Sequence, residues 1–295
     1  MKNHVFLLQV HKTPLLLRRI LKRLQGSNHY FCINIDAKVR DVDIFYDNLK
    51  DIENIIFISN ENIMHGGFSQ IACTVHQLKY SYSYKVKFDY FHSISGQDYP
   101  IVSNREFDDY FEHSTGSYML SDTEEEAHER RLGPYRQRLE HWYFMDVFNG
   151  PIARRLHISG ILNRLLYWIP RPLTFMDRIY GGWNWFSLHR DAVEYLLFFL
   201  TQHNEYINRF KYTFCTDEIF YSTILRPVRE KFNIYSRNSL RYIDWYPKRN
   251  CSSLPLILEE TEFEDIMSSG ALFCRKVDLP QSSKLLDRID SCCKD

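Results

Sequence analysis

The chain has 295 residues, enough for one large domain or two ordinary ones with a substantial buried core. Hydrophobic residues make up 44% of it and charged residues 25%, as in soluble globular proteins. Lys+Arg and Asp+Glu both count 37, so no overall charge attracts a nucleic acid or an acidic polymer. We therefore expect a neutral or small-molecule partner and no nucleic-acid partner.

Targeting signals and cysteine spacing indicate where the protein works. The opening run in "MKNHVFLLQVHK" is too short for a signal peptide, and no run reaches the roughly 20 apolar residues of a spanning helix. The seven cysteines show no CxxC spacing and are odd in number, which favours a reducing compartment without structural zinc. We expect a cytoplasmic protein.

Strand-like and helix-like runs alternate from the start of the chain. "HVFLLQV" predicts a strand, and Thr13 and Pro14 predict the cap and first position of a helix through "LLLRRILKRL", which stops at Gly26. Next come a strand "YFCINID", a polar helix over 41–49, a strand "NIIFIS" and a helix over about 69–80. This βαβ alternation predicts a mainly parallel sheet, with ligand sites at the carboxyl ends of its strands.

The run "FDYFHSISGQDYPI", residues 88–101, predicts a buried strand that leads into a small-residue turn and stops at Pro100. Residues 124–180 suggest an insertion and a helix laid over the mouth of the sheet. The rest of the chain predicts a strand "NWFSLHRD", one long helix over 192–210, a capped helix start in "CTDEIFYSTIL", and two short strands, "LRYIDW" and "LFCRKVD".

Two common phosphate-binding motifs are missing. The chain has neither GxGxxG nor GxxxxGK[ST], so dinucleotide-binding and P-loop interpretations fail. It contains one DxD sequence, Asp41 to Asp43, at the start of a predicted helix, where acids favour the helix dipole. We therefore expect a solvated helix start there and not a metal site.

Several segments in order resemble the core-2/I-branching β-1,6-N-acetylglucosaminyltransferase and peptide O-xylosyltransferase family. They are "QVHK", "INIDAK", "HGGFSQI", "YFHSISGQDYPI", "NWFSLHRDAVEYL", "TDEIFYSTIL", "LRYIDW" and "LFCRKVD", and they extend from Val10 to Asp278. The resemblance implies an α/β fold, a single GT-A type domain over 1–295 with a mostly parallel central sheet flanked by helices. Within it we expect a nucleotide-binding half (1–122), an acceptor-side insertion (123–180), and a catalytic and diphosphate-binding half (181–280).

The resemblance also implies inverting, metal-independent transfer of a sugar from a UDP-sugar, with no cofactor. Such a reaction needs a general base for the acceptor hydroxyl and cations for the leaving diphosphate. By the family's motifs, Glu218 is the base, and Arg241 and Lys276 bind the diphosphate. Each assignment has an alternative. Glu218 would otherwise be only an acid in the first turn of a helix, and Lys276 would otherwise pair with Asp278. Arg275 competes with Lys276 for the diphosphate, because a one-residue slip in strand register would exchange their positions.

The remaining site residues follow from the same match. Nucleoside contacts are expected from Val10, His11, Asp36 and His65. Gly66, Ser95, Gly96 and Asp98 are expected to form the donor-pocket loops, where Asp98 either touches the sugar or only fixes its turn. Acceptor contacts are expected from Trp183, Trp185, Glu124, Arg131 and Arg138.

The sequence gives the least information about the donor sugar and the acceptor. UDP-GlcNAc is the favoured donor and UDP-xylose the alternative, with a glycan or glycolipid as acceptor, as in polysaccharide biosynthesis. A catalytically silent UDP-sugar or glycan-binding protein is the competing class, and a retaining or hydrolytic enzyme would need a second carboxylate beside the first.

The segment 152–178 suggests a membrane contact as well. It carries Arg154, Arg155, Arg164, Arg171 and Arg178 among leucines and tryptophan. Such a segment either rests on the anionic inner face of the membrane or covers the core with extended arginines.

Overall fold

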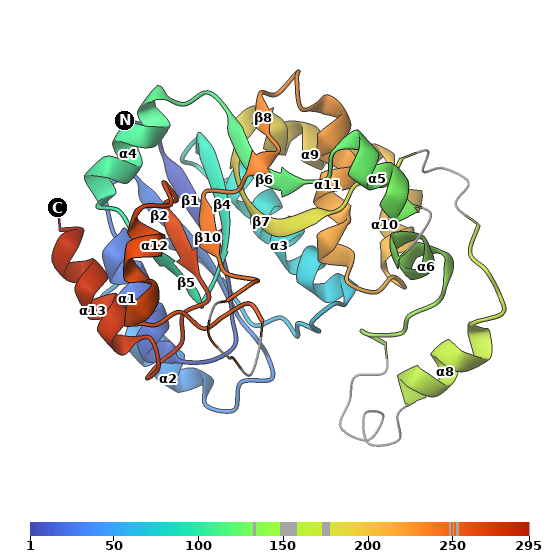
Figure 1. Ribbon diagram of the computed structural model, residues 1–295, viewed down its shortest axis with the longest axis horizontal. Helices are drawn as coiled ribbons and strands as arrows, with labels where there is room; N and C mark the ends of the chain where they lie inside the picture. Colours follow the sequence, from blue (N-terminus) through green and yellow to red (C-terminus); the bar gives the residue numbers. More distant parts are fainter. Residues whose placement is uncertain are drawn as a thin grey trace.

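A central sheet of eight strands runs through the molecule in the order β3-β2-β1-β4-β7-β6-β8, with β9 beside β6 (Figure 1). The computed structural model describes residues 1–131, 134–147, 158–172, 178–247, 249, 251 and 254–294. β3, β2, β1 and β4 are parallel, whereas β7 is antiparallel to both β4 and β6. The strands are β1 (His4–Val10), β2 (His29–Ile35), β3 (Ile55–Ser59), β4 (Tyr90–Ser95), β6 (Ser117–Ser121), β7 (Gly182–His189), β8 (Ile234–Tyr235) and β9 (Arg237–Asn238).

Helices cover both faces of this sheet, because its inner strands are apolar on both sides. Phe6, Leu8 and Val10 of β1 pack in the core under one face, and Val5 and Leu7 pack in the core under the other. The first core is closed by α1 (Pro14–Leu24), α2 (Val42–Leu49), α4 (Asn104–His113) and α13 (Ser283–Cys292). The second is closed by α3 (Phe68–Tyr82), α9 (Arg190–Gln202), α10 (Asn204–Phe210) and α11 (Phe220–Leu225). This arrangement confirms the predicted α/β class.

A second, small sheet has the order β10-β11-β5, formed by β10 (Arg241–Ile243), β11 (Phe273–Arg275) and β5 (Asp98–Pro100). The two late strands were predicted, and they pair in parallel. The run 88–101 is not one strand, however. It leaves the central sheet after Ser95, turns at Gly96 and Gln97, and pairs antiparallel with β11 in the second sheet.

Two helix predictions were wrong. The expected helix 192–210 begins earlier, at Arg190, and is broken between α9 and α10 at His203, whose backbone is not helical. The expected helix start at 215–225 is instead a 3-10 turn, η1 (Thr216–Glu218), ahead of α11. Cys215 has a positive φ of 48° and donates its backbone N–H to the carbonyl oxygen of Gly66 (2.8 Å), so a contact distant in sequence sets this turn.

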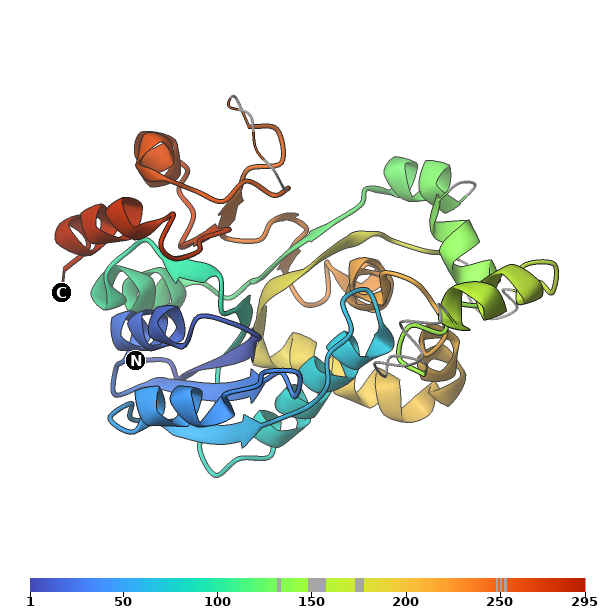
Figure 2. The ribbon, with the colours of Figure 1, turned by 90° about the horizontal axis from the view of Figure 1, so that it is seen from below.

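The segment 123–180, for which we expect a role on the acceptor side, contains α5 (Glu124–Arg131), α6 (Pro134–Glu140) and α8 (Ile158–Leu166). α8 does not cover the mouth of the sheet as predicted: it has no buried residue. Figures 1 and 2 both place it at the opposite end of the molecule from α13. No helix among the described residues is long and apolar enough to cross a membrane, and all seven cysteines are free.

The remaining short elements complete the C-terminal half: η2 (Arg226–Val228), η3 (Glu260–Glu262) and α12 (Phe263–Met267). Together with α13, η3 and α12 lie on the same side as the second sheet (Figure 2). α12 and α13 contribute Ile266 and Leu286 to the first core, so this half of the chain is tied to the face of the central sheet that carries α1.

A row of buried polar side chains crosses the interior between the two faces. His4 Nδ1 lies 3.0 Å from His92 Nε2, and His92 Nδ1 lies 2.8 Å from Ser187 Oγ, which accepts a hydrogen bond from Arg241 (2.9 Å). Burial lowers the pKa of His4 to about 3, with His29 adding to the effect, and burial also lowers the pKa of His92. Both rings are therefore neutral near pH 7.

Candidate active site

The predicted donor side lies at the carboxyl ends of β1 and β4. Gly96 follows β4, and a Cβ atom built on it would lie 2.9 Å from Val10 Cγ1, so only glycine fits without displacing that side chain. Its N–H donates to the carbonyl oxygen of Gln9 (3.1 Å). Val10 is buried, and the carbonyl oxygen of Val10 accepts from the N–H of Asp36 (2.8 Å). Val10, Asp36 and Gly96 thus meet at one edge of the sheet.

Asp98 holds the turn that follows β4. Its side chain is fully buried, and Oδ2 accepts from the backbone N–H (2.7 Å) and the hydroxyl (2.5 Å) of Ser95. Arg275 of β11 donates to the same oxygen (2.9 Å) and to Ser95 Oγ (2.5 Å). Of the two roles left open by the sequence, the structure shows the one that fixes the turn, and the contact with a sugar stays a prediction.

Arg275 and Lys276, which competed for one predicted role in diphosphate binding, have different surroundings in the structure. The Arg275 guanidinium pairs with Asp98 and lies over the Trp185 ring, 4.1 Å from its centre. The Lys276 ammonium has no hydrogen-bond or ion-pair partner in the described part of the chain, and Asp278, its partner in the alternative interpretation, pairs with Lys12 instead. Partial burial lowers the pKa of Lys276, and Lys12 and Arg275 lower it further. Lys276 is therefore a cation held close to two others without an anion of its own.

Arg241 lies beneath this cluster. Its side chain is 7% exposed, and its guanidinium donates to Ser187 Oγ and to the carbonyl oxygens of Ser93 (3.1 Å), Phe186 (2.9 Å) and Ser239. Burial lowers the pKa of Arg241 to about 10, a shift that Asp98 opposes and Arg275 reinforces. In this arrangement Arg241 joins β4, β7 and β10 from inside, so its direct contact with a diphosphate stays a prediction.

His11 and Asp36 are arranged around the same edge. Partial burial and the neighbouring Lys12 lower the pKa of His11, Asp36 opposes this shift, and Lys276 adds a smaller lowering effect. The Asp36 carboxylate accepts from the ammonium (2.8 Å) and the backbone N–H (2.9 Å) of Lys38. Lys12 was not among the predicted site residues, although it directly follows His11 in "QVHK".

The predicted base, Glu218, lies in a turn that is hydrogen-bonded to the "HGGF" loop. Thr216 Oγ1 donates to the carbonyl oxygen of Gly67 (3.1 Å), and Gly66 has a φ of +73°, which suits glycine. Glu218 follows in the turn with 43% of its side chain exposed, in an ion pair with Arg138. Arg138, expected to contact an acceptor, therefore lies beside the predicted base.

A hydrogen-bonded path connects this turn to the donor edge. Gln9 of β1 donates to the carbonyl oxygen of Gln70 (2.7 Å), and Gln70 Nε2 donates to Asp217 (3.3 Å). Burial raises the pKa of Asp217, and the adjacent Glu218 raises it further; His65 has the opposite effect. Asp217 accepts from Gln70 and does not cap a helix, whereas Glu218 is paired with Arg138.

The other predicted acceptor residues are not gathered at one point. Glu124 accepts from Arg178 (3.0 Å) and from the Tyr180 hydroxyl (2.8 Å), which ties α5 to the chain ahead of β7. Trp183 lies near Trp245, with 6.3 Å between ring centres. Trp185 belongs with Arg275 at the donor edge, and the Arg131 side chain lies outside the described residues.

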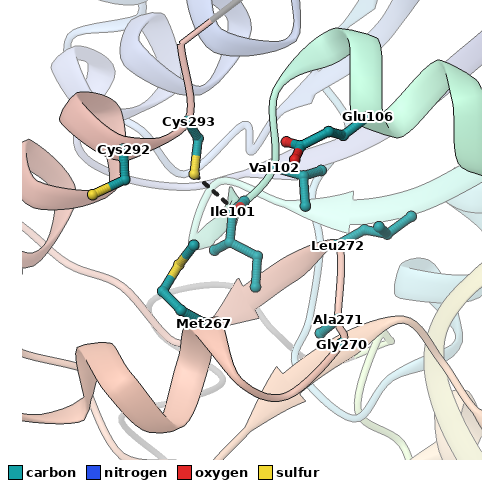
Figure 3. Close-up of a pocket in the computed structure, with 9 residues that line it drawn as sticks. All are labelled: Ile101, Val102, Glu106, Met267, Gly270, Ala271, Leu272, Cys292 and Cys293. Carbon is teal, nitrogen blue, oxygen red and sulfur yellow. Dashed lines mark hydrogen bonds between the residues drawn. The ribbon is translucent and has the colours of Figure 1, made fainter.

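A separate pocket lies where the chain after β5 meets α4, the loop after α12 and the end of α13 (Figure 3). Cys293 Sγ donates to the carbonyl oxygen of Ile101 (3.1 Å) at its rim. Its lining is mostly apolar, with Glu106 as the charged member, and it contains none of the predicted site residues. We therefore place the candidate active site at the strand ends and not in this pocket.

The chain is similar, at low identity, to several known glycosyltransferases. A β-glucuronosyltransferase of Arabidopsis thaliana is 24% identical over 297 residues, covering 94% of this chain and 62% of that protein. A xylosyltransferase of Caenorhabditis elegans is 24% identical, covering 93% and 34%. A human β-1,3-galactosyl-O-glycosyl-glycoprotein β-1,6-N-acetylglucosaminyltransferase is 21% identical, covering 80% and 53%. The chain thus spans less than two thirds of the length of each.

Among solved structures, the apo form of mouse xyloside xylosyltransferase 1 is similar with a TM-score of 0.35 and 9% identity, covering 94% of this chain and 96% of that one. A family model described as "Core-2/I-Branching enzyme" matches residues 5–267, which include both sides of the candidate site up to β10. The chain therefore belongs to the Core-2/I-Branching enzyme family.

Proposed function

We propose that this chain is a glycosyltransferase that moves a sugar from a UDP-sugar to a hydroxyl of a glycan or glycolipid, with inversion and without a metal ion at the donor site. The observation that carries the proposal is the cation Lys276, which Lys12 and Arg275 crowd beside the Ser95–Asp98 turn. Lys12 is paired with Asp278 and Arg275 with Asp98, so one positive charge of this cluster has no partner in the described part of the chain, and a diphosphate would supply its anion. The named relatives, all glycosyltransferases, support this reading.

Glu218 is the proposed general base. Its carboxylate would take the proton of the acceptor hydroxyl while that oxygen attacks the anomeric carbon. The bond between that carbon and the phosphate oxygen breaks, and its electron pair stays on the leaving UDP. Arg138 would orient the Glu218 carboxylate until the acceptor arrives, because the two already form an ion pair.

Lys276 is the proposed direct partner of the leaving diphosphate. Arg241 would act from beneath, by holding β4, β7 and β10 in register and adding positive charge to the turn. Val10, His11, Asp36 and His65 would surround the nucleoside, with Gly66, Ser95, Gly96 and Asp98 shaping the loops around the sugar. Trp183, Glu124, Arg131 and Arg138 stay the proposed acceptor contacts.

UDP-GlcNAc is the donor we favour, and UDP-xylose is the alternative. The names of the relatives cover N-acetylglucosaminyl, xylosyl and glucuronosyl transfer, so a donor screen needs all three UDP-sugars. The choice depends on the space beside the Ser95–Asp98 turn, where the sugar would stand.

Replacing the proposed base provides the first test. Glu218→Gln removes the proton acceptor but keeps the size of the side chain, so UDP release from the productive UDP-sugar should fall about 10²- to 10⁴-fold. UDP-sugar binding should change less than threefold. Glu230→Gln, at a side chain that is 89% exposed, is the matched control and should keep full activity. An unchanged rate in the Glu218 variant would remove this residue from the mechanism, and a wild-type protein that binds donors without turnover would favour the silent-protein class.

The two cations should respond differently to substitution. Lys276→Met should weaken UDP binding about tenfold, roughly 1.4 kcal/mol, and leave uridine binding unchanged, because the lost contact is to phosphate. Equilibrium dialysis measures both, with Lys284→Met on the exposed side of α13 as the control.

Arg241→Lys should instead lower the free energy of unfolding by about 2 kcal/mol, because buried carbonyl oxygens lose their donor. Unaltered stability together with weakened UDP binding in that variant would restore Arg241 as a direct ligand.

We also propose that the described part of segment 152–178 rests on a membrane surface. Among the large apolar side chains exposed there are Ile161 (54%), Leu165 (67%), Trp168 (84%) and Ile169 (54%). Residues 158–172 contain Arg164 and Arg171 and no acidic residue, which suits anionic lipid. Arg171 is buried and donates to the carbonyl oxygens of His141 (3.2 Å) and Tyr212 (2.6 Å). This arginine therefore packs on the protein interior, as the alternative interpretation of the segment predicted.

Vesicle flotation tests this contact. The wild type should float with vesicles that contain anionic lipid, and the double variant Leu165→Ser, Trp168→Ser should lose most of that binding. Phe198→Ser, at a 62% exposed position on α9, should not change it. Equal flotation of both variants would refute the contact through α8, and so would the absence of wild-type flotation.

A further inference from the structure

Two histidines and an aspartate, side chains of types that commonly bind metal ions, lie together at the end of the sheet opposite the candidate active site. His4 begins β1, His29 begins β2, and Asp108 lies on α4. His29 Nε2 lies 2.9 Å and His4 Nε2 lies 3.6 Å from the same oxygen, Asp108 Oδ1. Both rings are buried, whereas the Asp108 side chain is 20% exposed and borders solvent.

The hydrogen bonds of His29 leave one contact unexplained. Its Nδ1 lies 2.7 Å from the carbonyl oxygen of Leu24, which only accepts, so the Nδ1 proton is fixed. In a neutral ring Nε2 then carries a lone pair, and this lone pair faces a carboxylate oxygen at 2.9 Å. Two acceptors at that distance repel each other unless a proton or another cation lies between them.

His4 presents a second unexplained atom. Its Nδ1 is occupied by His92, while its Nε2 is buried and has no hydrogen-bond partner within the described part of the chain. This orphaned nitrogen is directed at the same carboxylate oxygen. One cation in contact with all three atoms would satisfy both histidines, whereas a proton on His29 would satisfy only one.

We propose that His4 Nε2, His29 Nε2 and Asp108 Oδ1 bind one divalent transition-metal ion, with Zn²⁺ the best match to two imidazoles and a carboxylate. Zinc–ligand bonds of about 2.0–2.2 Å in a tetrahedron separate the ligand atoms by roughly 3.4 Å, between the two distances that the structure has. The three ligand atoms all lie within 4.8 Å of one another, so small side-chain movements suffice. The partial exposure of the Asp108 side chain would let a water molecule take the fourth position.

The surroundings resemble the outer shell of a metal site. The second nitrogen of each histidine is already held, by the Leu24 carbonyl oxygen and by His92, as in sites where outer contacts orient the ligands. Asn28 Nδ2 donates to Asp108 Oδ1 (2.9 Å) and orients the carboxylate. The rings of Phe107 and Phe111 pack against His4, with centres 5.2 and 5.3 Å away, and exclude water from that side.

The ion would be structural and not catalytic. The seven-residue strand β1 separates it from Val10 at the donor edge by about 20 Å. It would join the first residues of β1 and β2 to α4, next to the row His4–His92–Ser187 that ends at Arg241. Removing it should therefore lower stability without removing a group from the sugar-transfer chemistry, so the proposal stands or falls independently of the proposed function.

Cobalt titration of the chelator-treated full chain tests the site. We expect one equivalent of Co²⁺ to produce the visible bands of a tetrahedral ion with nitrogen and oxygen ligands, to be displaced by Zn²⁺, and to raise the melting temperature. Sulfur-to-cobalt charge-transfer bands would reveal thiolate binding instead, and a Cys251→Ser, Cys292→Ser variant keeps the two exposed thiols of the described residues out of the measurement.

Matched variants assign the ligands. Asp108→Asn and His29→Gln should each weaken Co²⁺ binding at least tenfold, whereas His203→Gln, which breaks an exposed His–Glu pair of the same 2.9 Å length, should leave it unchanged. The wild-type titration decides the question even if a variant fails to fold. Absence of a tight equivalent in the wild type would overturn the proposal, as would a doubly protonated His29 in ¹⁵N NMR spectra that added Zn²⁺ does not alter. Equal binding in a folded Asp108→Asn variant would overturn it too.

Discussion

The fully buried Asp98 carboxylate is the constraint on which the donor side depends. A buried charge has to be paired, and removing one partner of such a pair costs about 3–5 kcal/mol. Asp98 is paired by Arg275 and by both donors of Ser95. This one contact joins the end of β4 to β11, strands that lie in different sheets and far apart in the sequence.

Several features of the site follow from that contact. Arg275 is turned toward Asp98 and lies over Trp185, whereas the next residue, Lys276, has no paired anion among the residues that the structure describes. The same turn holds Gly96 close to Val10, which is one of the residues predicted to contact the nucleoside. Arg241 supports this surface from below through carbonyl oxygens of β4 and β7. The proposed chemistry thus depends on a charge balance that leaves one cation unmatched.

The sequence was informative where burial sets a simple pattern. β1 and β2 are apolar on both faces, so their extent was predicted within two residues at each end. The broken helix at His203, the 3-10 turn before α11 and the second strand at Asp98 were missed, because contacts distant in sequence decide them. α4 was also missed, although Ser103 and Glu106 carry the spacing of a capping box that announces it.

The features of the candidate site also fall into those that the sequence could predict and those that it could not. The motif match identified Val10, His11, Asp36 and Gly96 together, because they lie at or just after the ends of β1, β2 and β4, which the parallel part of the central sheet gathers at one edge. Lys276 follows β11 of the second sheet. The match could not separate Arg275 from Lys276, since that depends on pairing with Asp98. It also could not show that Arg241 lies inside, because a strand pattern does not report which carbonyl oxygens a guanidinium reaches. The histidines at the amino ends of β1 and β2 carry no spacing signal at all.

The central claim is that side-chain cations alone bind the donor, and calorimetric titration in EDTA tests it most directly. Wild-type protein would be titrated with UDP, UDP-GlcNAc, UDP-xylose and UDP-glucuronic acid, and then again with Mn²⁺ in place of EDTA. The account predicts saturable binding of UDP and of one preferred UDP-sugar in EDTA, with little change when Mn²⁺ is added. Binding that appears only with Mn²⁺ would contradict it and return attention to Asp41, Asp43 and Asp98 as metal ligands.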